Sequence, residues 1–100
     1  MIGAPKFPAF EGFSWARSKR EANIAKHGVD FSRAEDFDLS TALVWVDDRH
    51  NYGEVREIAL GLIGNRLHIL VYARRAPFLH VISLRKANRR ERNRYEEEKA

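Results

Sequence analysis

The spacing of apolar residues predicts two helices in the first third of the chain. Residues 15–27 have helical periodicity, with Ser14 placed to cap the start and Gly28 to end the helix in the left-handed conformation. A shorter helix is expected over residues 31–37, begun by Asp30. The apolar positions that would face inward from these helices are Trp15, Ala22, Ala25, Val29, Phe31, Ala34 and Phe37.

Four strands and a last helix are expected in the rest of the chain. The predicted strands span 42–46, 55–62, 67–73 and 78–84. Their connections are short, and Gly64-Asn65 supplies a tight turn, which favours an antiparallel meander. The expected fold class is therefore α+β: two N-terminal helices, a four-stranded antiparallel meander sheet and a C-terminal helix, with the helices covering one sheet face. Residues 1–12 are expected to be an N-terminal extension, and residues 13–100 a single domain.

Alternation along the third strand predicts which of its side chains leave the core. The set interpreted as core beneath the helices is Leu67, Ile69, Val71 and Ala73. The alternate positions His68, Tyr72 and Arg74 are then expected on the exposed face.

The fourth strand raises a question of register. His80 and Arg85 have opposite parity, so they share a face only if the strand bulges or ends before Arg85. We expect the strand to end there, which frees Arg85 to point toward the exposed face. Arg56, Arg74 and Arg85 are then expected to converge on the uncovered side of the sheet. Glu54 lies two residues before Arg56, so both side chains are expected on the same face of the sheet.

Charge indicates an anionic partner. The 100 residues carry 18 Lys and Arg against 14 Asp and Glu, a net charge of +4 with a pI near 9.8. Residues 85–99 hold seven of the cations and four glutamates, although such a run is also typical of a solvated helix surface. No apolar run approaches the roughly 18 residues of a membrane span, and no signal peptide is recognisable. A cytoplasmic protein without cysteine chemistry, and with no membrane partner, is expected.

Two separate motifs resemble a known family. The first contains Phe13-Ser14-Trp15 and then Lys26-His27-Gly28-Val29-Asp30-Phe31. The second is Ile82-Ser83-Leu84-Arg85-Lys86-Ala87, followed by Glu91 and Tyr95. Together they resemble the BrnT-type toxins over residues 13–96. The chain departs from that pattern at His80, where members commonly carry Arg, at Leu84, commonly Ala, and after Trp15, where Asp-Pro is frequent.

The resemblance implies a RelE/ParE-like fold and a ribonuclease toxin that halts translation. It also implies a cognate antitoxin, and contact with operator DNA only through the toxin–antitoxin complex. Metal-free RNA cleavage needs cations for the phosphorane and groups that transfer protons. The residues expected to be catalytic are Arg56, His80, Arg85, Tyr95 and Glu54. Those expected to bind RNA are His68, Tyr72, Arg74, Arg75, Lys86 and Arg89. No cofactor or metal is expected, because the four His lack ligand spacing.

Structural roles are open for several of these residues. Arg85 can pair with a glutamate of the tail, and Arg56 with Glu54 or Glu57. Tyr95 can simply pack the last helix against the sheet. Two other functions also fit the sequence: a non-catalytic toxin of the same fold that acts on a protein, and a plain RNA-binding module.

Overall fold

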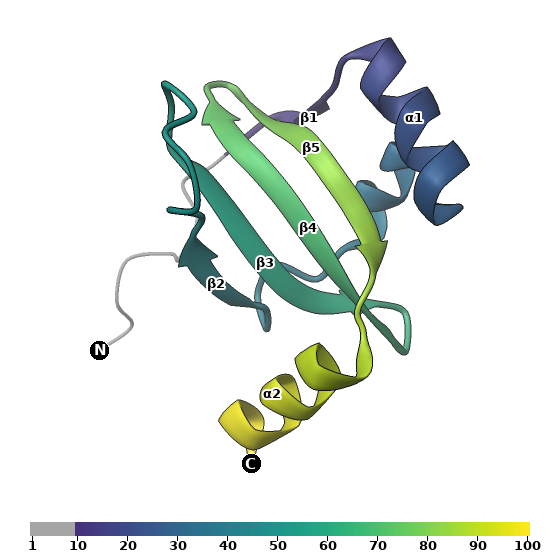
Figure 1. Cartoon of the computed structure of the whole chain (residues 1–100), viewed down its shortest axis with the longest axis vertical. Coiled ribbons are helices and arrows are strands. Elements are labelled where there is room, and N and C mark those ends of the chain that lie inside the picture. The colour runs from purple at the N-terminus through teal and green to yellow at the C-terminus, as the bar shows by residue number, and fades with distance from the viewer. Residues whose placement is uncertain (1–9) are drawn as a thin grey trace.

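A five-stranded mixed sheet forms the centre of the molecule, in the order β1-β5-β4-β3-β2 (Figure 1). The computed structural model describes residues 10–100. The elements in chain order are β1 (Gly12–Ser14), α1 (Arg17–His27), the 3-10 helix η1 (Phe31–Asp36), β2 (Leu43–Val46), β3 (Arg56–Ile63), β4 (Arg66–Arg75), β5 (Phe78–Lys86) and α2 (Arg89–Lys99). The α+β class is confirmed, but the expected four-stranded antiparallel sheet is wrong by one parallel edge strand.

That additional strand, β1, pairs in parallel with β5, so that Phe13 lies opposite Leu79 and Ser14 opposite His80. Three residues are too few to show an alternating pattern, so β1 could not be recognised from the spacing of apolar residues. The expected boundary of the N-terminal extension at residue 12 falls inside β1, and residues 1–9 of that extension lie outside the described part of the chain.

The first helix begins two residues later than expected and without the predicted cap. Ala16 occupies the N-cap position and makes no side-chain bond there, because Ser14 is held in β1. The predicted end is confirmed: Gly28 has a φ of 71° and its N–H donates to the carbonyl of Ile24. The second predicted helix is a 3-10 helix, and Asp30 caps it by accepting from the N–H of Ser32.

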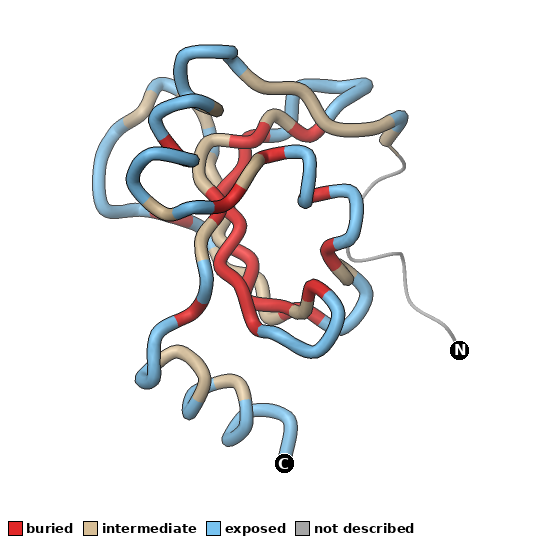
Figure 2. The backbone as a smooth tube through the Cα atoms, turned by 90° about the vertical axis from the view of Figure 1, so that its right-hand side faces the viewer, coloured by how far each residue is buried: buried red, intermediate tan, exposed pale blue. Residues whose placement is uncertain are grey.

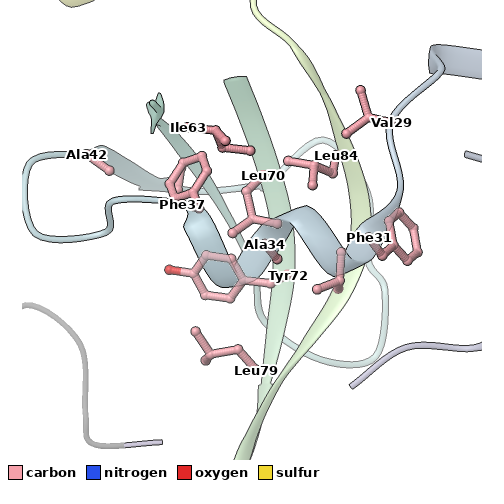
Figure 3. Packing of buried hydrophobic residues seen from close by; sticks show 12 residues of the cluster. Val29, Phe31, Ala34, Phe37, Ala42, Ile63, Leu70, Tyr72, Leu79 and Leu84 are labelled. Carbon is pink, nitrogen blue, oxygen red and sulfur yellow. The ribbon is translucent and has the colours of Figure 1, made fainter. Parts of the chain in front are cut away.

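Both faces of the sheet are apolar, and η1 packs on one of them. Phe31, Leu70 and Tyr72 are fully buried members of the cluster on the η1 side (Figure 3). A second cluster covers the opposite face, which we call the open face; its buried members are Leu60, Leu67, Ile69, Val71 and Ala87. Residues 67–73 of β4 are all buried, whereas β1 and β2 contain no buried residue, and Figure 2 shows the buried backbone at the centre of the molecule. The side chains of β4 that were expected beneath the helices therefore lie on the open face, and the alternate set lies beneath η1. The sequence could not tell the two sets apart, because a central strand buried on both faces is apolar at odd and even positions alike.

Asn23 joins α1 to the sheet through its buried side-chain amide. Its Nδ2 donates to the carbonyl oxygens of Val29, at 2.9 Å, and Leu84, at 2.7 Å, and its Oδ1 accepts from the N–H of Leu84. Only 7% of the residue is exposed, so these backbone groups have no access to replacement water.

We predict that Asn23→Ala lowers the free energy of unfolding by about 2 kcal/mol, because buried backbone groups lose their partners. Urea denaturation followed by circular dichroism measures the change. Asn93→Ala, on the exposed surface of α2, is the matched control and should leave the midpoint unchanged. An Asn23→Ala midpoint equal to that of the control would contradict this role.

A β-bulge interrupts the pairing of β4 with β5. Val71 lies opposite Ser83 and Tyr72 opposite Val81, which leaves Ile82 unpaired between them. The bulge reverses the parity of β5, so His80 and Arg85 both belong to the open face. The expectation that the strand ends before Arg85 is wrong, since β5 continues to Lys86.

The C-terminal helix α2 projects from one end of the sheet and has no buried residue (Figures 1 and 2). Asn88 and Glu91 form a capping box at its start. Tyr95 packs against the open-face cluster, and the Arg94 guanidinium lies 4.3 Å from the centre of the Trp45 ring. None of the helices in residues 10–100 is long and apolar enough to cross a membrane.

Candidate active site

A row of three paired residues brings a cation and a histidine together on the open face. Arg56 of β3 lies opposite Ala73 of β4, and Ala73 lies opposite His80 of β5. Adjacent strands are about 4.8 Å apart, so the Arg56 and His80 backbones are separated by only about 10 Å. Because the residue between them carries a single methyl group, space is left between the two functional side chains.

Arg56 differs from the other arginines of this end of the sheet in its partners. Its guanidinium carbon lies 4.0 Å from the centre of the Tyr52 ring, a cation–π contact. Its Nε is buried and has no hydrogen-bond acceptor among the described residues. The two carboxylates expected as its partners are taken elsewhere, since Glu57 binds Arg74 and Glu54 binds Arg75. Arg56 therefore forms no direct ion pair with a described residue, and its guanidinium can be offered to a ligand.

Two hollows meet at Arg56 and Ile82. The larger, which we call the central hollow, has a volume of about 340 Å³. It is lined by Lys26, His27, Trp45, Asp47, Arg49, Tyr52, Arg56, Ile58, Ile69, Val71, Ile82, Ser83, Arg85 and Glu91. The smaller, the side hollow, has a volume of about 210 Å³. It is lined by Ala16, Lys19, Arg56, Arg75, His80, Val81 and Ile82. Arg56 is thus the cation that both spaces share.

His80 is held by the serine of the extra strand. Its Nδ1 lies 2.9 Å from the Ser14 hydroxyl oxygen, which leaves Nε2 as the ring nitrogen available to a ligand. Partial burial and the positive charge of Arg75 lower the pKa of His80, and the Glu54 carboxylate opposes that shift. The imidazole is consequently neutral over a wider pH range than an exposed histidine, as a general base requires.

Arg85 enters the central hollow already paired. Its guanidinium donates from both terminal nitrogens to the Glu91 carboxylate, each at 2.8 Å. These bonds raise the pKa of Arg85 and lower the pKa of Glu91. The pairing with a glutamate of the tail, which the sequence left open as an alternative to a catalytic role, is therefore present in the structure. His27, on the wall formed by the end of α1, has its pKa lowered by burial and by the charges of Lys26 and Arg85.

The loop between β2 and β3 forms another wall. The buried carboxylate of Asp47 accepts a bidentate pair of hydrogen bonds from Arg49 and a third bond from the Tyr52 hydroxyl. These bonds lower the pKa of Asp47, which stays ionised. The network holds the Tyr52 ring beneath Arg56. The central hollow then has four cations, Lys26, Arg49, Arg56 and Arg85, and two carboxylates, Asp47 and Glu91, an excess of positive charge that suits an anion.

The residues predicted to be catalytic are only partly brought together. Arg56, His80 and Arg85 line the two hollows, and Glu54 lies beside them through its pair with Arg75. Tyr95 lines neither hollow: it packs α2 against the sheet, and its hydroxyl donates to the Thr41 carbonyl at 3.5 Å. For Tyr95, the structure shows the alternative packing role and does not place it with the other residues predicted to be catalytic.

The structure corrects the predicted facing of three residues that were expected to bind RNA. Tyr72 has no exposed surface and lies in the core beneath η1, where no base can stack on it. His68 is only 6% exposed, and its Nδ1 lies 2.9 Å from the Arg66 carbonyl. Arg74 belongs to the face opposite Arg56 and binds Glu57. All three errors follow from the inverted facing of β4. Arg75 lines the side hollow, whereas Lys86 and Arg89 are exposed and lie outside both hollows.

Several lining residues were not predicted from the sequence. His27 and the loop 47–52 are absent from the residues predicted from the sequence to be catalytic or RNA-binding. The sequence signal that could have indicated a role for this loop was its mixture of charged and aromatic residues directly after β2. Lys26 belongs to a basic flank of α1 that the periodicity alone does not orient. No group of three His, Asp or Glu side chains that could hold a metal ion is found in the described range 10–100.

Comparison with known proteins gives this fold and site a family. Residues 15–91 match the family model described as the ribonuclease toxin BrnT of type II toxin–antitoxin systems, so the chain belongs to the BrnT toxin family. It is similar to the crystal structure of the Brucella abortus ribonuclease toxin BrnT, with 29% sequence identity and a TM-score of 0.63. That match covers 78% of this chain and 97% of the Brucella chain. A search of the curated proteins finds no match.

Proposed function

We propose that this protein is a metal-independent endoribonuclease toxin that cleaves RNA through the substrate's own 2′-hydroxyl group. The observation that carries the proposal is the position of Arg56. Its unpaired guanidinium separates two hollows, one with His80 on its wall and the other with Arg85 and His27. An arginine keeps its charge at every physiological pH and offers a planar set of donors to phosphate oxygens. Membership of a family of ribonuclease toxins supports the same substrate.

The reaction follows from these positions. His80 accepts the proton of the 2′-hydroxyl through Nε2, and the 2′-oxygen forms a bond to the adjacent phosphorus. Arg56 stabilises the added negative charge of the pentacoordinate phosphorane. The bond between phosphorus and the 5′-oxygen then breaks. The products are a 2′,3′-cyclic phosphate and a free 5′-hydroxyl, whose oxygen takes a proton. That proton comes from water, and the hydroxide left behind takes up the proton held by His80, which returns the base to its neutral form.

Ser14 and the Arg75–Glu54 pair act as positioning residues. Ser14 fixes the orientation of the His80 ring through Nδ1, and Glu54 moderates the effect of Arg75 on the pKa of His80. The Glu54 carboxylate is bound by Arg75, which lowers its pKa. Glu54 therefore acts through its neighbours rather than as a proton carrier itself.

A cognate antitoxin is the partner that this function requires in a cell. Type II systems, to which the family belongs, pair a toxin with a protein inhibitor. We propose that the antitoxin covers the open face and so blocks the two hollows. Operator DNA would be bound only through that complex, and both proteins would act in the cytoplasm.

Incubation of purified protein with single-stranded RNA in excess EDTA tests the proposal. We expect cleavage at the same rate with EDTA as with Mg²⁺, because protein side chains supply both the charge and the proton transfer. Folding of the sample is checked by circular dichroism. Intact RNA after incubation with folded protein, or cleavage only with Mg²⁺, would overturn the proposal. Growth arrest in the absence of transcript cleavage would favour a protein target instead.

A further inference from the structure

The floor of the central hollow is apolar, although its rim is charged. Ile58, Ile69, Val71 and Ile82 line it alongside the cations. These side chains come from β3, β4 and β5, with Ile58 opposite Val71 and Ile82 at the bulge. A phosphate group would lose hydration against such a floor without gaining a hydrogen bond. The floor therefore suits a part of the ligand that is flat and weakly hydrated.

Aromatic rings stand at the edge of the same hollow. Trp45 lies opposite Ile58 on the edge strand β2, and Tyr52 lies beneath Arg56. Each ring already contacts a guanidinium, Trp45 that of Arg94 and Tyr52 that of Arg56. Phosphate-binding cations, aromatic edges and an apolar floor occur together in proteins that bind single-stranded nucleic acid. A volume of about 340 Å³ is at the lower end for ligand sites and suits one nucleoside rather than a length of strand.

We infer that the central hollow receives one unpaired nucleobase of the substrate, while Arg56 binds the adjacent phosphate, so that the enzyme selects single-stranded RNA. This inference rests on the function proposed above and adds the substrate class. In a duplex the base is paired and stacked, and extruding it costs a few kcal/mol. A strand already unpaired can place a base on the floor formed by Ile58 and Ile82 without that cost.

Binding of RNA that cannot be cleaved separates this inference from catalysis. The probe is a fluorescent octamer with 2′-O-methyl groups throughout, which removes the nucleophile, and affinity is measured by fluorescence anisotropy. It is compared with the same strand annealed to its complement, and with a single strand of equal length and charge that lacks every base. We expect the single strand to bind about tenfold more tightly than either comparison ligand, from burial of one base. Equal affinity for the intact and the abasic strand would overturn the inference, even if the protein proves to be a ribonuclease.

Filling the hollow identifies where the base binds. Ile82→Trp is expected to lower affinity for the intact strand to that for the abasic strand, and to leave abasic binding unchanged. Ile24→Trp, a matched change on the exposed surface of α1, should bind like the wild type. Abasic binding also checks the fold of each variant; if Ile82→Trp loses it, Ile58→Asn, which makes the floor polar, decides in its place. Retention of the tenfold preference by a folded hollow variant would show that the base binds elsewhere.

Discussion

Replacing Arg56 with alanine is expected to slow RNA cleavage by about two to three orders of magnitude, comparable to the loss of one charge-stabilising donor in other enzymes. Arg56 is shared by both hollows and has no ion-pair partner in residues 10–100. Its removal therefore takes away the charge that balances the phosphorane, and the arginines nearest to it, Arg49, Arg75 and Arg85, are each held by a carboxylate. Single-turnover cleavage of a labelled RNA measures the effect on the chemical step.

Two further variants define the cause of that loss. Arg66→Ala removes an exposed arginine from the far end of β4 and should cleave at the wild-type rate. Arg56→Lys keeps the charge but loses the planar set of donors, so it should recover only part of the rate. Equal rates for Arg56→Ala and Arg66→Ala would remove Arg56 from the mechanism.

Replacing His80 with alanine is expected to reduce cleavage by about two to four orders of magnitude, the usual contribution of a general acid or base. The pKa of His80 is lowered by burial and by Arg75, so the neutral base persists to more acidic pH than for an exposed histidine. The wild-type rate should therefore rise with pH, and the midpoint of that rise should lie below 6.5, the ordinary histidine pKa. The His80→Ala variant should lose this rise.

Ser14→Ala tests the positioning of the same ring. Without the hydroxyl that lies 2.9 Å from Nδ1, the ring is free to turn, and the single-turnover rate should fall while RNA affinity is retained.

His50→Ala is the matched control for His80→Ala, because His50 is an exposed loop histidine that lines neither hollow. If the cleavage rate of His80→Ala still rises with pH in the acidic range, the group that titrates there is not His80.

The fold was predictable from the sequence wherever a pattern was long or a residue type was decisive. Gly28 ended α1 as expected, and Asp30 capped the next turn. Prediction failed where the spacing of apolar and polar residues carries no information about the structure. β1 has three residues, too few for periodicity. β4 is apolar on both faces, so its alternation could not say which side η1 covers, and Tyr72 was assigned to the wrong face.

The residue types of the candidate site could be predicted from the sequence, but the alignment of those residues across neighbouring strands could not. Arg56, His80 and Arg85 are of the residue types that RNA cleavage needs, and all three border the hollows. What joins His80 and Arg85 on one face is the bulge at Ile82, and no residue type marks such an insertion. Ser14 was assigned to a helix cap because its partner, His80, lies 66 residues away in sequence. Contacts of that kind arise from the assembled sheet.

The chemical form of the new RNA ends tests the central claim most directly. After cleavage in EDTA, the 3′ end of the upstream fragment can be identified by mass spectrometry. Attack by the 2′-hydroxyl at the phosphate bound by Arg56 predicts a 2′,3′-cyclic phosphate, with a 5′-hydroxyl on the downstream fragment. A 3′-hydroxyl paired with a 5′-phosphate would mean that water, not the substrate, is the nucleophile, and would contradict the account.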